Sequence, residues 1–382
     1  MADTTNHYAP DYATPPGETL LETIEYLGMS QAELAERTGR PKKTINEIIK
    51  GKALITPETA QQLELVLGIP ASFWNNAERN YRQFLAQQKQ EQFLEQHQDW
   101  MQGFPVAAML NMGWIPQAKR PTEKLRGILQ FFGIASPEQW QTVWGAPKVA
   151  YRKTRAHTQQ PNDNAAKINS VWLRKGELQA HAIQCAPYNR QRFKQALQTI
   201  RTLTPEPLND CFPKIQKLCA DAGVAFVLVP ELPTSRACGA THWLTSGKAI
   251  LQLSLRHKSD DHFWFSFFHE AGHILLHGKT TFIDFEDNSQ RSSEQEQQAN
   301  TFATDFLIPP EEFQQCIGTP NFRSKQNIAE FAQHIGIAPG IVVGRLQHDG
   351  YIPYRNCNGL KKKLAWGENN QVIHPAQKEV AE

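Results

Sequence analysis

The sequence lacks the features that would place the chain in a membrane or outside the cell. It has no apolar run of about 18 residues, the length at which a helix begins to span a bilayer. The N-terminal stretch MADTTNHYAPDYATPPGE is polar and acidic, without the basic start and apolar core of a secretory signal. We therefore expect a cytoplasmic protein with no membrane partner.

Paired cysteines and a strong overall charge are also missing. The 6 cysteines are scattered, without a Cys-x-x-Cys pair. Such spacing is typical of free thiols in a reducing compartment and argues against a disulfide framework or a cysteine zinc site. The formal net charge is only +2, so any contact with nucleic acid must depend on a local cluster of charge.

The length of 382 residues predicts about two or three domains. From the apolar periodicity and the turns we predict a disordered arm (1–16), an all-α domain (17–75), a mostly helical middle region (76–205), an α+β domain (206–320), a helical subdomain (321–366) and a polar tail (367–382). In the α+β domain we expect helices over 209–222, 260–277 and 292–307 and strands over 223–230 and 248–255. The middle region carries no chemical motif, and we interpret it as a spacer or an oligomerisation surface.

The stretch FWFSFFHEAGHILLHG carries the strongest chemical signal. His269 and His273 are four residues apart, so on a helix they share one face and can bind one metal ion. Glu270 lies a helical step of about 100° from His269, beside such an ion and next to a bound water. A zinc ion lowers the pKa of that water to about 7, and Glu270 can then act as general base and acid.

A catalytic zinc site needs a third protein ligand. His277 continues the spacing, but it lies about 12 Å from His269 along a helix, which is too far for one ion. Glu296 and Asn300 are again four apart on a second helix, so Glu296 can bind the metal while Asn300 accepts the free ring N–H of a ligand histidine. Glu294 is the second candidate for the third ligand.

Other interpretations of this stretch compete. Its apolar residues also fit a plain core helix, and a fourth protein ligand would make the zinc purely structural. Gly272 costs about 1 kcal/mol relative to alanine inside a helix, which indicates close packing or a ligand that needs space. An oxyanion needs a donor besides the metal. For this role His242 is the first candidate, although a purely structural histidine is the alternative we favour at that position, and Arg256 and His262 are weaker candidates.

Residues 206–310 resemble the ImmA/IrrE family of metallopeptidases. The resemblance rests on GATHWLTSGKAILQLSLR, HEAGHILLH and EQQANTFATDFLIP, and it extends into FAQHIGIAPGIVVGRLQHDG. It implies a zincin-like fold, with His269, His273 and a downstream glutamate as ligands and Glu270 as catalyst. Family members commonly have a glutamate directly before the Ala-Asn pair, where this chain has Gln298. The segment around FAQHIGIAPG also has helix-turn-helix spacing, which we interpret as packing or protein recognition.

The N-terminal segment has the spacing of a helix-turn-helix. We expect Ser30 and Glu33 to form a capping box, Gly39 to allow the turn and Pro41 to precede a helix ending at Lys50. Between Arg37 and Lys52 lie six basic residues and a single acidic one, Glu47. The residues predicted to contact DNA are Gln31, Arg40, Lys42, Lys43, Thr44, Asn46 and Lys50. The alternative is a small helical bundle with a solvated basic face.

Residues 17–81 resemble Xre-type regulators related to HigA antitoxins, particularly in the ending LGIPASFWNN. The resemblance implies binding to a double-stranded DNA operator, usually as a homodimer, in a toxin–antitoxin or stress-response setting. Our hypothesis is a transcriptional regulator with a Zn²⁺-dependent peptidase domain that acts on a protein substrate, such as a repressor, or on a cognate toxin. The alternative is a HigA-like transcriptional antitoxin whose zincin domain only binds a partner.

Overall fold

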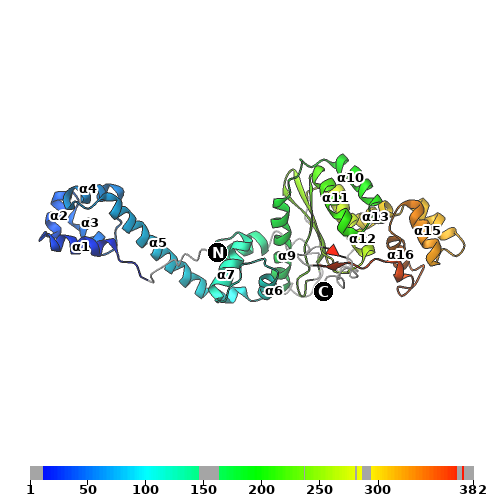
Figure 1. Ribbon diagram of the computed structural model, residues 1–382, viewed down its shortest axis with the longest axis horizontal. Coiled ribbons are helices and arrows are strands. Elements are labelled where there is room, and N and C mark those ends of the chain that lie inside the picture. Colours follow the sequence, from blue (N-terminus) through cyan, green and yellow to red (C-terminus); the bar gives the residue numbers. More distant parts are fainter. Residues whose placement is uncertain are drawn as a thin grey trace, which may run out of the picture. The chain divides into compact units, whose positions relative to one another are not determined.

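The computed structural model describes residues 12–145, 163–235, 237–279, 282–285, 294–367 and 372–373. The chain divides into two compact units, residues 1–98 and 99–382 (Figure 1). The first is all-α, and the second combines helices with a small sheet, which confirms the predicted fold class. Most of the predicted arm and tail, residues 1–11 and 374–382, lies outside the described residues. Among the described helices, none is both long and apolar enough to cross a membrane.

Five helices build the N-terminal unit. They are α1 (Pro16–Tyr26), α2 (Gln31–Thr38), α3 (Lys42–Ile49), α4 (Pro57–Leu67) and α5 (Ala71–Gln96). Ser30 caps α2 by accepting the Glu33 backbone N–H, and Gly39 takes the left-handed conformation that ends α2. The Glu33 carboxylate accepts from Arg37 instead of completing the expected capping box. The turn between α2 and α3 therefore has the predicted helix-turn-helix form.

The long helix α5 belongs to the N-terminal unit. It runs without a break across position 75, where we predicted a domain boundary. Trp74 is fully buried in the core of this unit. Glu78 accepts hydrogen bonds from the Ile55 backbone N–H and from Arg82, which fixes α5 to the segment after α3.

A four-stranded sheet organises the C-terminal unit. Its strands are β1 (Val224–Leu228), β2 (Ala237–Thr245), β3 (Lys248–Leu253) and β4 (Phe282–Phe285), in the order β1-β3-β2-β4. β1 and β3 are parallel, whereas β2 is antiparallel to both of its neighbours, β3 and β4. The predicted strands correspond to β1 and β3, but the sequence did not indicate β2 or β4.

Helices surround this sheet. They are α6 (Val106–Asn111), α7 (Pro121–Phe132), α8 (Pro137–Trp140), α9 (Asp163–Ala182), α10 (Arg190–Thr202), α11 (Leu208–Asp221), α12 (Asp260–Leu276), α13 (Glu294–Leu307), α14 (Pro310–Gly318), α15 (Lys325–Ile335) and α16 (Pro339–His348). Shorter pieces among the described residues are 3₁₀ turns (Gln98–Met101 and Asn358–Leu360), a π-helical turn (Gln141–Gly145) and a two-stranded ribbon, β5 (Ala365–Trp366) with β6 (Val372–Ile373).

The sheet has a separate apolar core on each face. α9 covers one face, where Trp140, Trp144 and Trp172 are buried, and α11 and α12 cover the other, around Phe226 and Phe267 (Figure 1). α9 is held by hydrogen bonds from Gln252 to the Trp172 carbonyl and from Trp172 to Val229. Residues 163–205 are therefore part of the C-terminal unit, not of a spacer as we predicted.

Candidate metal centre

α12 and α13 position the candidate ligands. The apolar side chains of α12 pack on the sheet, and its glycine allows α13 to come close. A Cβ at Gly272 would lie 3.0 Å from the Phe302 ring and 3.4 Å from the Ala299 Cα. The first distance is shorter than an ordinary van der Waals contact, and the second is at its lower limit. Of the two explanations expected for Gly272, close packing of the helices is therefore the one that applies.

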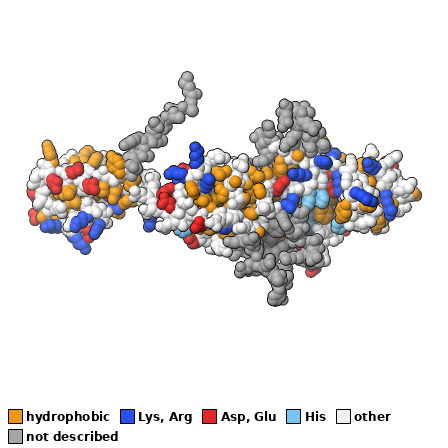
Figure 2. Space-filling model, turned by 90° about the horizontal axis from the view of Figure 1, so that it is seen from below, with side chains coloured by type: hydrophobic (Ala, Val, Ile, Leu, Met, Phe, Trp, Pro, Cys, Tyr) orange, Lys and Arg blue, Asp and Glu red, His pale blue; other side chains and the backbone are white. Residues whose placement is uncertain are grey.

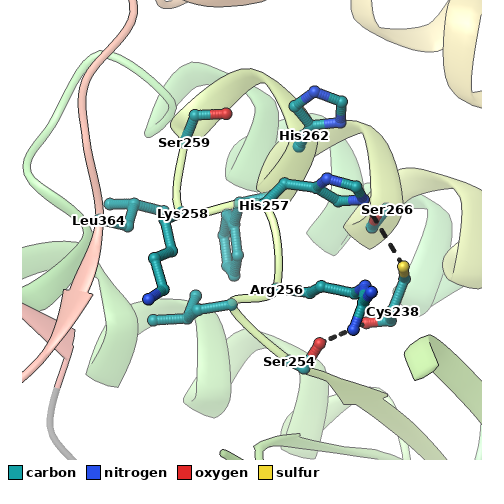
Figure 3. A pocket seen from close by; sticks show the side chains of 11 residues that line it. Cys238, Ser254, Arg256, His257, Lys258, Ser259, His262, Ser266 and Leu364 are labelled. Carbon is teal, nitrogen blue, oxygen red and sulfur yellow. Dashed lines mark hydrogen bonds between the residues drawn. The ribbon is translucent and has the colours of Figure 1, made fainter. Parts of the chain in front are cut away.

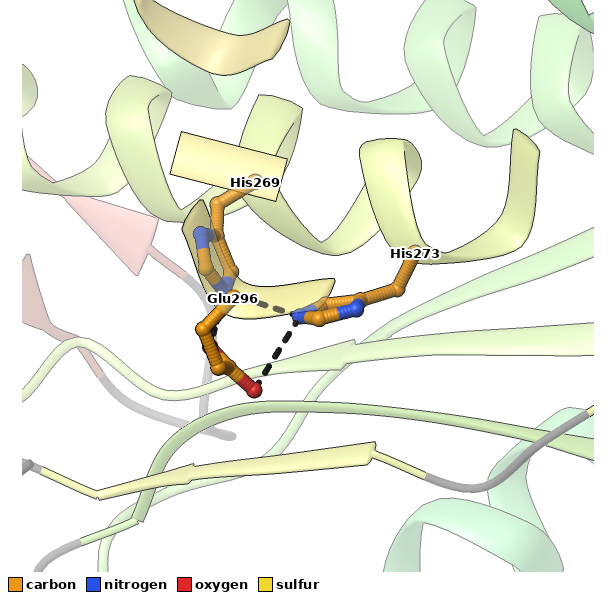
Figure 4. Close-up of side chains that lie close together, drawn as sticks. All are labelled: His269, His273 and Glu296. Carbon is orange, nitrogen blue, oxygen red and sulfur yellow. Dashed lines mark hydrogen bonds and ion pairs between the residues drawn. The ribbon is translucent and has the colours of Figure 1, made fainter. Parts of the chain in front are cut away.

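Three ligand side chains meet between these helices (Figure 4). The Nε2 atoms of His269 and His273 are 3.0 Å apart, and the carboxylate of Glu296 lies 3.3 Å from His269 Nε2 and 3.6 Å from His273 Nε2. A tetrahedral zinc with bonds of about 2.0–2.1 Å keeps its ligand atoms about 3.3 Å apart. All three residues are buried. Two imidazole nitrogens and one carboxylate in this arrangement fit a zinc ion.

The remaining polar atoms of the ligands are also occupied. Asn300 Oδ1 lies 2.9 Å from His269 Nδ1, and His273 Nδ1 lies 2.9 Å from His277 Nδ1. The ring of Phe282 stacks on that of His273, with centroids 3.9 Å apart. Both histidines thus present Nε2 to the shared point between them. His277 is thus a partner of a ligand histidine, a role that its spacing in the sequence did not indicate.

Glu270 lies deep beside β2. Its side chain is 0% exposed, and a Cβ added at Gly239 would lie 2.5 Å from Glu270 Oε1. The backbone of β2 therefore contacts the carboxylate directly, which only glycine permits. Glu294, the second candidate for the third ligand, instead accepts a hydrogen bond from Gln298.

His242 has the structural role that we weighed against an oxyanion donor. Side chains alternate along a strand, so His242 points to the face of β2 opposite Gly239 and Glu270. On that face it lies 3.4 Å from Glu177 of α9, which also binds Arg174. His242 is a buried polar contact between β2 and α9, away from the metal centre.

The two weaker oxyanion candidates lie at a small pocket near the start of α12 (Figure 3). Arg256 donates to the Ser235 carbonyl, and His262 stacks on His257 with centroids 4.3 Å apart. Cys238 Sγ is 3.7 Å from His257 Nε2. Neither candidate is among the residues grouped around the possible metal position.

A larger recess adjoins the metal centre. It measures about 210 Å³ and lies where α12, α13 and α16 meet, lined by Phe265, Leu307, Ile308, Ile341, Arg345 and His348. Phe265 is 38% exposed, and its ring centroid is 6.2 Å from that of His269. Phe265 thus lines this recess and also lies near the ring of a ligand histidine.

Three of the seven predicted DNA-contacting residues are exposed, and the other four are half-buried. Lys42, Lys43 and Lys50 are exposed on or just after α3, while Thr44, Asn46 and Gln31 are half-buried. Figure 2 shows Lys and Arg side chains gathered on one side of the N-terminal unit.

Arg40 departs from this set of surface contacts. Its Nε donates to Gln62 at 2.6 Å, and its NH2 lies 3.2 Å from Glu58. Both partners belong to α4, so Arg40 fixes α4 to the turn before α3. Arg40 thus has internal partners within the unit, and its contact with DNA stays a prediction.

Comparison with known proteins locates two families. Residues 25–74 match the family model described as Helix-turn-helix, and residues 231–347 match the IrrE N-terminal-like domain. The chain is 33% identical over 61 residues to the uncharacterized HTH-type transcriptional regulator YddM of Escherichia coli, covering 16% of this chain and 65% of that protein. It is 35% identical over 71 residues to virulence-associated protein A of Dichelobacter nodosus, covering 18% of this chain and 70% of that protein.

A solved structure also matches a short part of the chain. The addiction module antidote protein of the HigA family from Coxiella burnetii is 31% identical, with 22% of this chain and 91% of that one covered and a TM-score of 0.21. The family matches define the class: a helix-turn-helix protein with a metallopeptidase-type domain. These matches confirm both resemblances, to helix-turn-helix regulators over residues 25–74 and to the ImmA/IrrE family over residues 231–347.

Proposed function

We propose that this chain is a cytoplasmic transcriptional regulator whose C-terminal unit is a zinc-dependent peptidase. The observation that carries this proposal is the meeting of His269, His273 and Glu296 around one point, with Glu270 buried on the next position of α12. A chain that only bound a partner would have no use for a buried carboxylate directly after a ligand histidine. The substrate is a protein, such as a repressor or a cognate toxin at the same locus.

The residues of the site divide the chemical work. His269, His273 and Glu296 hold the zinc, which when bound supplies Lewis-acid polarisation of a carbonyl and an activated water. Glu270 takes a proton from water and returns it to the leaving amine. Burial keeps the Glu270 carboxylate away from bulk solvent, and the contact with Gly239 fixes its position.

The sheet offers a place for the substrate chain. β4 is one of the two edge strands among the described strands, and its first residue, Phe282, stacks on His273. An extended peptide paired to a sheet edge gains backbone hydrogen bonds. A peptide on β4 would pass the metal centre and could place an apolar side chain in the recess beside Phe265.

The N-terminal unit directs the protein to DNA. We infer that α3 enters the major groove of an operator, with Lys42, Lys43 and Lys50 at phosphates or guanine edges and Asn46 at adenine. Gln31, the first residue of α2, is placed for a backbone phosphate. A homodimer would bind two half-sites.

The second candidate function is a transcriptional antitoxin whose C-terminal unit binds a partner without cleaving it. One relative, which matches 16% of this chain, is named a transcriptional regulator, and such a role requires no cleavage. This candidate shares the DNA-binding unit and differs only in the need for Glu270.

The test separates metal binding from catalysis. Purified protein should hold about one zinc, and His269→Ala or His273→Ala should remove it, while Glu270→Gln should retain it. Glu296→Ala should cost more zinc than Glu294→Ala. Wild-type protein should cleave a protein encoded beside its gene, and Glu270→Gln should cleave at a rate lower by about 10²–10⁴-fold with operator affinity unchanged. Normal transcriptional responses in a Glu270→Gln strain would favour the antitoxin.

A further inference from the structure

A chain of hydrogen bonds runs from the metal centre to the protein surface. His273 Nδ1 contacts His277 Nδ1 at 2.9 Å, His277 Nε2 contacts Gln298 Oε1 at 3.0 Å, and Gln298 Nε2 contacts Glu294 Oε1 at 3.1 Å. His273 is 1% exposed, His277 is half-buried, and Gln298 and Glu294 are exposed. The chain joins the end of α12 to the start of α13.

In this series of hydrogen bonds, the donor and acceptor of each contact determine the donor and acceptor of the next. A carboxylate only accepts hydrogen bonds, so Gln298 must turn its NH₂ group toward Glu294. The Gln298 carbonyl oxygen then faces His277 and accepts its Nε2–H. In the neutral His277 ring, Nδ1 is left as the acceptor.

The same donor and acceptor roles determine the tautomer of the metal ligand His273. His273 must carry its proton on Nδ1, which it donates to His277, so its Nε2 lone pair points at the position shared with His269 and Glu296. At His269, Asn300 does the same in one step, because its Oδ1 lies 2.9 Å from His269 Nδ1. The two ligand histidines thus reach the same tautomer by different partners.

We propose that His277 and Gln298 are positioning residues of the metal centre, which hold His273 in the tautomer and ring orientation that bind zinc. This inference rests on the proposed function for the presence of zinc, but not on peptidase activity. It also gives a reason for Gln298 in place of a glutamate. The Gln298 amide can accept from His277 and donate to Glu294 at the same time, whereas a glutamate carboxylate could only accept.

The experiment measures zinc affinity by competition with a chelator in the full-length protein. His277→Leu removes the acceptor at similar size and should weaken zinc binding about 10–100-fold, the usual effect of removing such a partner. His277→Gln keeps an acceptor and a donor and should restore most of the affinity. Gln298→Leu should cause a smaller loss of zinc affinity. It removes the hydrogen-bond partner that orients the His277 ring but leaves His277 itself in place. Gln297→Leu, the same change at the adjacent exposed position, is the matched control and should leave the affinity unchanged.

Two readouts separate positioning from plain structural damage. Metal-free His277→Leu and His277→Gln should unfold at temperatures close to that of metal-free wild type. The inference is overturned if His277→Leu binds zinc as tightly as wild type, or if His277→Gln loses as much affinity as His277→Leu. In both cases the metal centre itself stands, as long as His269→Ala abolishes binding. If wild type binds zinc no better than His269→Ala, both the inference and the proposed metal centre fail.

Discussion

The two units place their candidate functional residues in opposite environments. In the N-terminal unit these are surface side chains, and that of Lys43 is 84% exposed. In the C-terminal unit they are core side chains, with His273 at 1% and Glu270 at 0%. A surface lysine acts almost independently of its neighbours, whereas each buried ligand depends on the atoms packed around it. The units should therefore respond differently to mutation, gradually in one and abruptly in the other.

The sharpest test of this difference is a single methyl group at Gly239. We expect Gly239→Ala to displace the Glu270 carboxylate, since the added Cβ would lie 2.5 Å from Oε1 and 2.8 Å from Cγ. A displacement of about 1 Å can cost about 10²-fold in rate. Proteolysis should fall by that factor or more, while zinc content and operator affinity stay at wild-type levels.

Gly247→Ala is the matched control for this change. Gly247 lies in the turn between β2 and β3, and a Cβ there would meet nothing within 4 Å. This variant should cleave like wild type. Wild-type cleavage by Gly239→Ala would mean that Glu270 has no fixed position, and the contrast between the two units would lose its strongest support.

The sequence predicted those parts of the site that lie within one helix. His269, Glu270 and His273 share α12, and Glu296 and Asn300 share α13, so helical periodicity was enough to group them. The caps and the turn of the N-terminal unit were equally local. Ser30 and Gly39 needed only their neighbours in the chain to be interpreted.

What the sequence could not predict depends on contacts across elements. β2 was missed, and with it the orientation of His242, because one residue of shift along a strand exchanges its two faces. The contact of Gly239 with Glu270 joins residues from two elements whose pairing no local pattern reveals. For Arg40 the basic residue type was recognised, but its partner Gln62 lies 22 residues away. His277 had the right spacing and was judged only as a ligand.

In the N-terminal unit, each exposed lysine that is replaced should lower operator affinity by a separate, moderate amount. We expect Lys42→Ala with Lys43→Ala to weaken operator binding and to flatten its salt dependence, by about 0.9 in the log–log slope for each DNA phosphate that the variant no longer neutralises. Binding of the full-length protein to a palindromic site upstream of its own gene, measured at several salt concentrations, gives that slope.

Arg40→Ala serves as the internal comparison for the lysine variant. Because Arg40 bonds to Gln62 and Glu58, its removal should lower the stability of the N-terminal unit and leave the salt slope of the remaining folded protein unchanged. A slope that falls for Arg40→Ala and not for the lysine pair would reverse our assignment of the DNA-contacting residues.

The smallest predicted effect concerns a buried charge away from the metal centre. Burial raises the pKa of Asp260, at the start of α12, to about 6. Its Oδ1 accepts the backbone N–H groups of Asp261 and Lys362, and a Cβ at Gly340 of α16 would lie only 2.5 Å from that oxygen. An asparagine keeps an acceptor there and cannot ionise. Asp260→Asn therefore isolates the cost of the buried negative charge.

The direction of the pH effect follows from the raised pKa of Asp260. A carboxyl with a raised pKa contributes stability that is fully present below its usual pKa and is lost as the pH rises through about 6. Wild type should therefore lose stability on going from pH 4 to pH 8, whereas Asp260→Asn should not. The free energy of unfolding of the variant relative to wild type should rise over this range by about 3 kcal/mol at most. Denaturant unfolding followed by tryptophan fluorescence measures this, since all tryptophans except Trp74 belong to the C-terminal unit. Asp221→Asn, at an exposed position of α11, controls for the removed charge. If the stability of Asp260→Asn relative to wild type is the same at both pH values, Asp260 is not held protonated by burial. The packed core of the C-terminal unit would then tolerate a charge as readily as the surface of the N-terminal unit does.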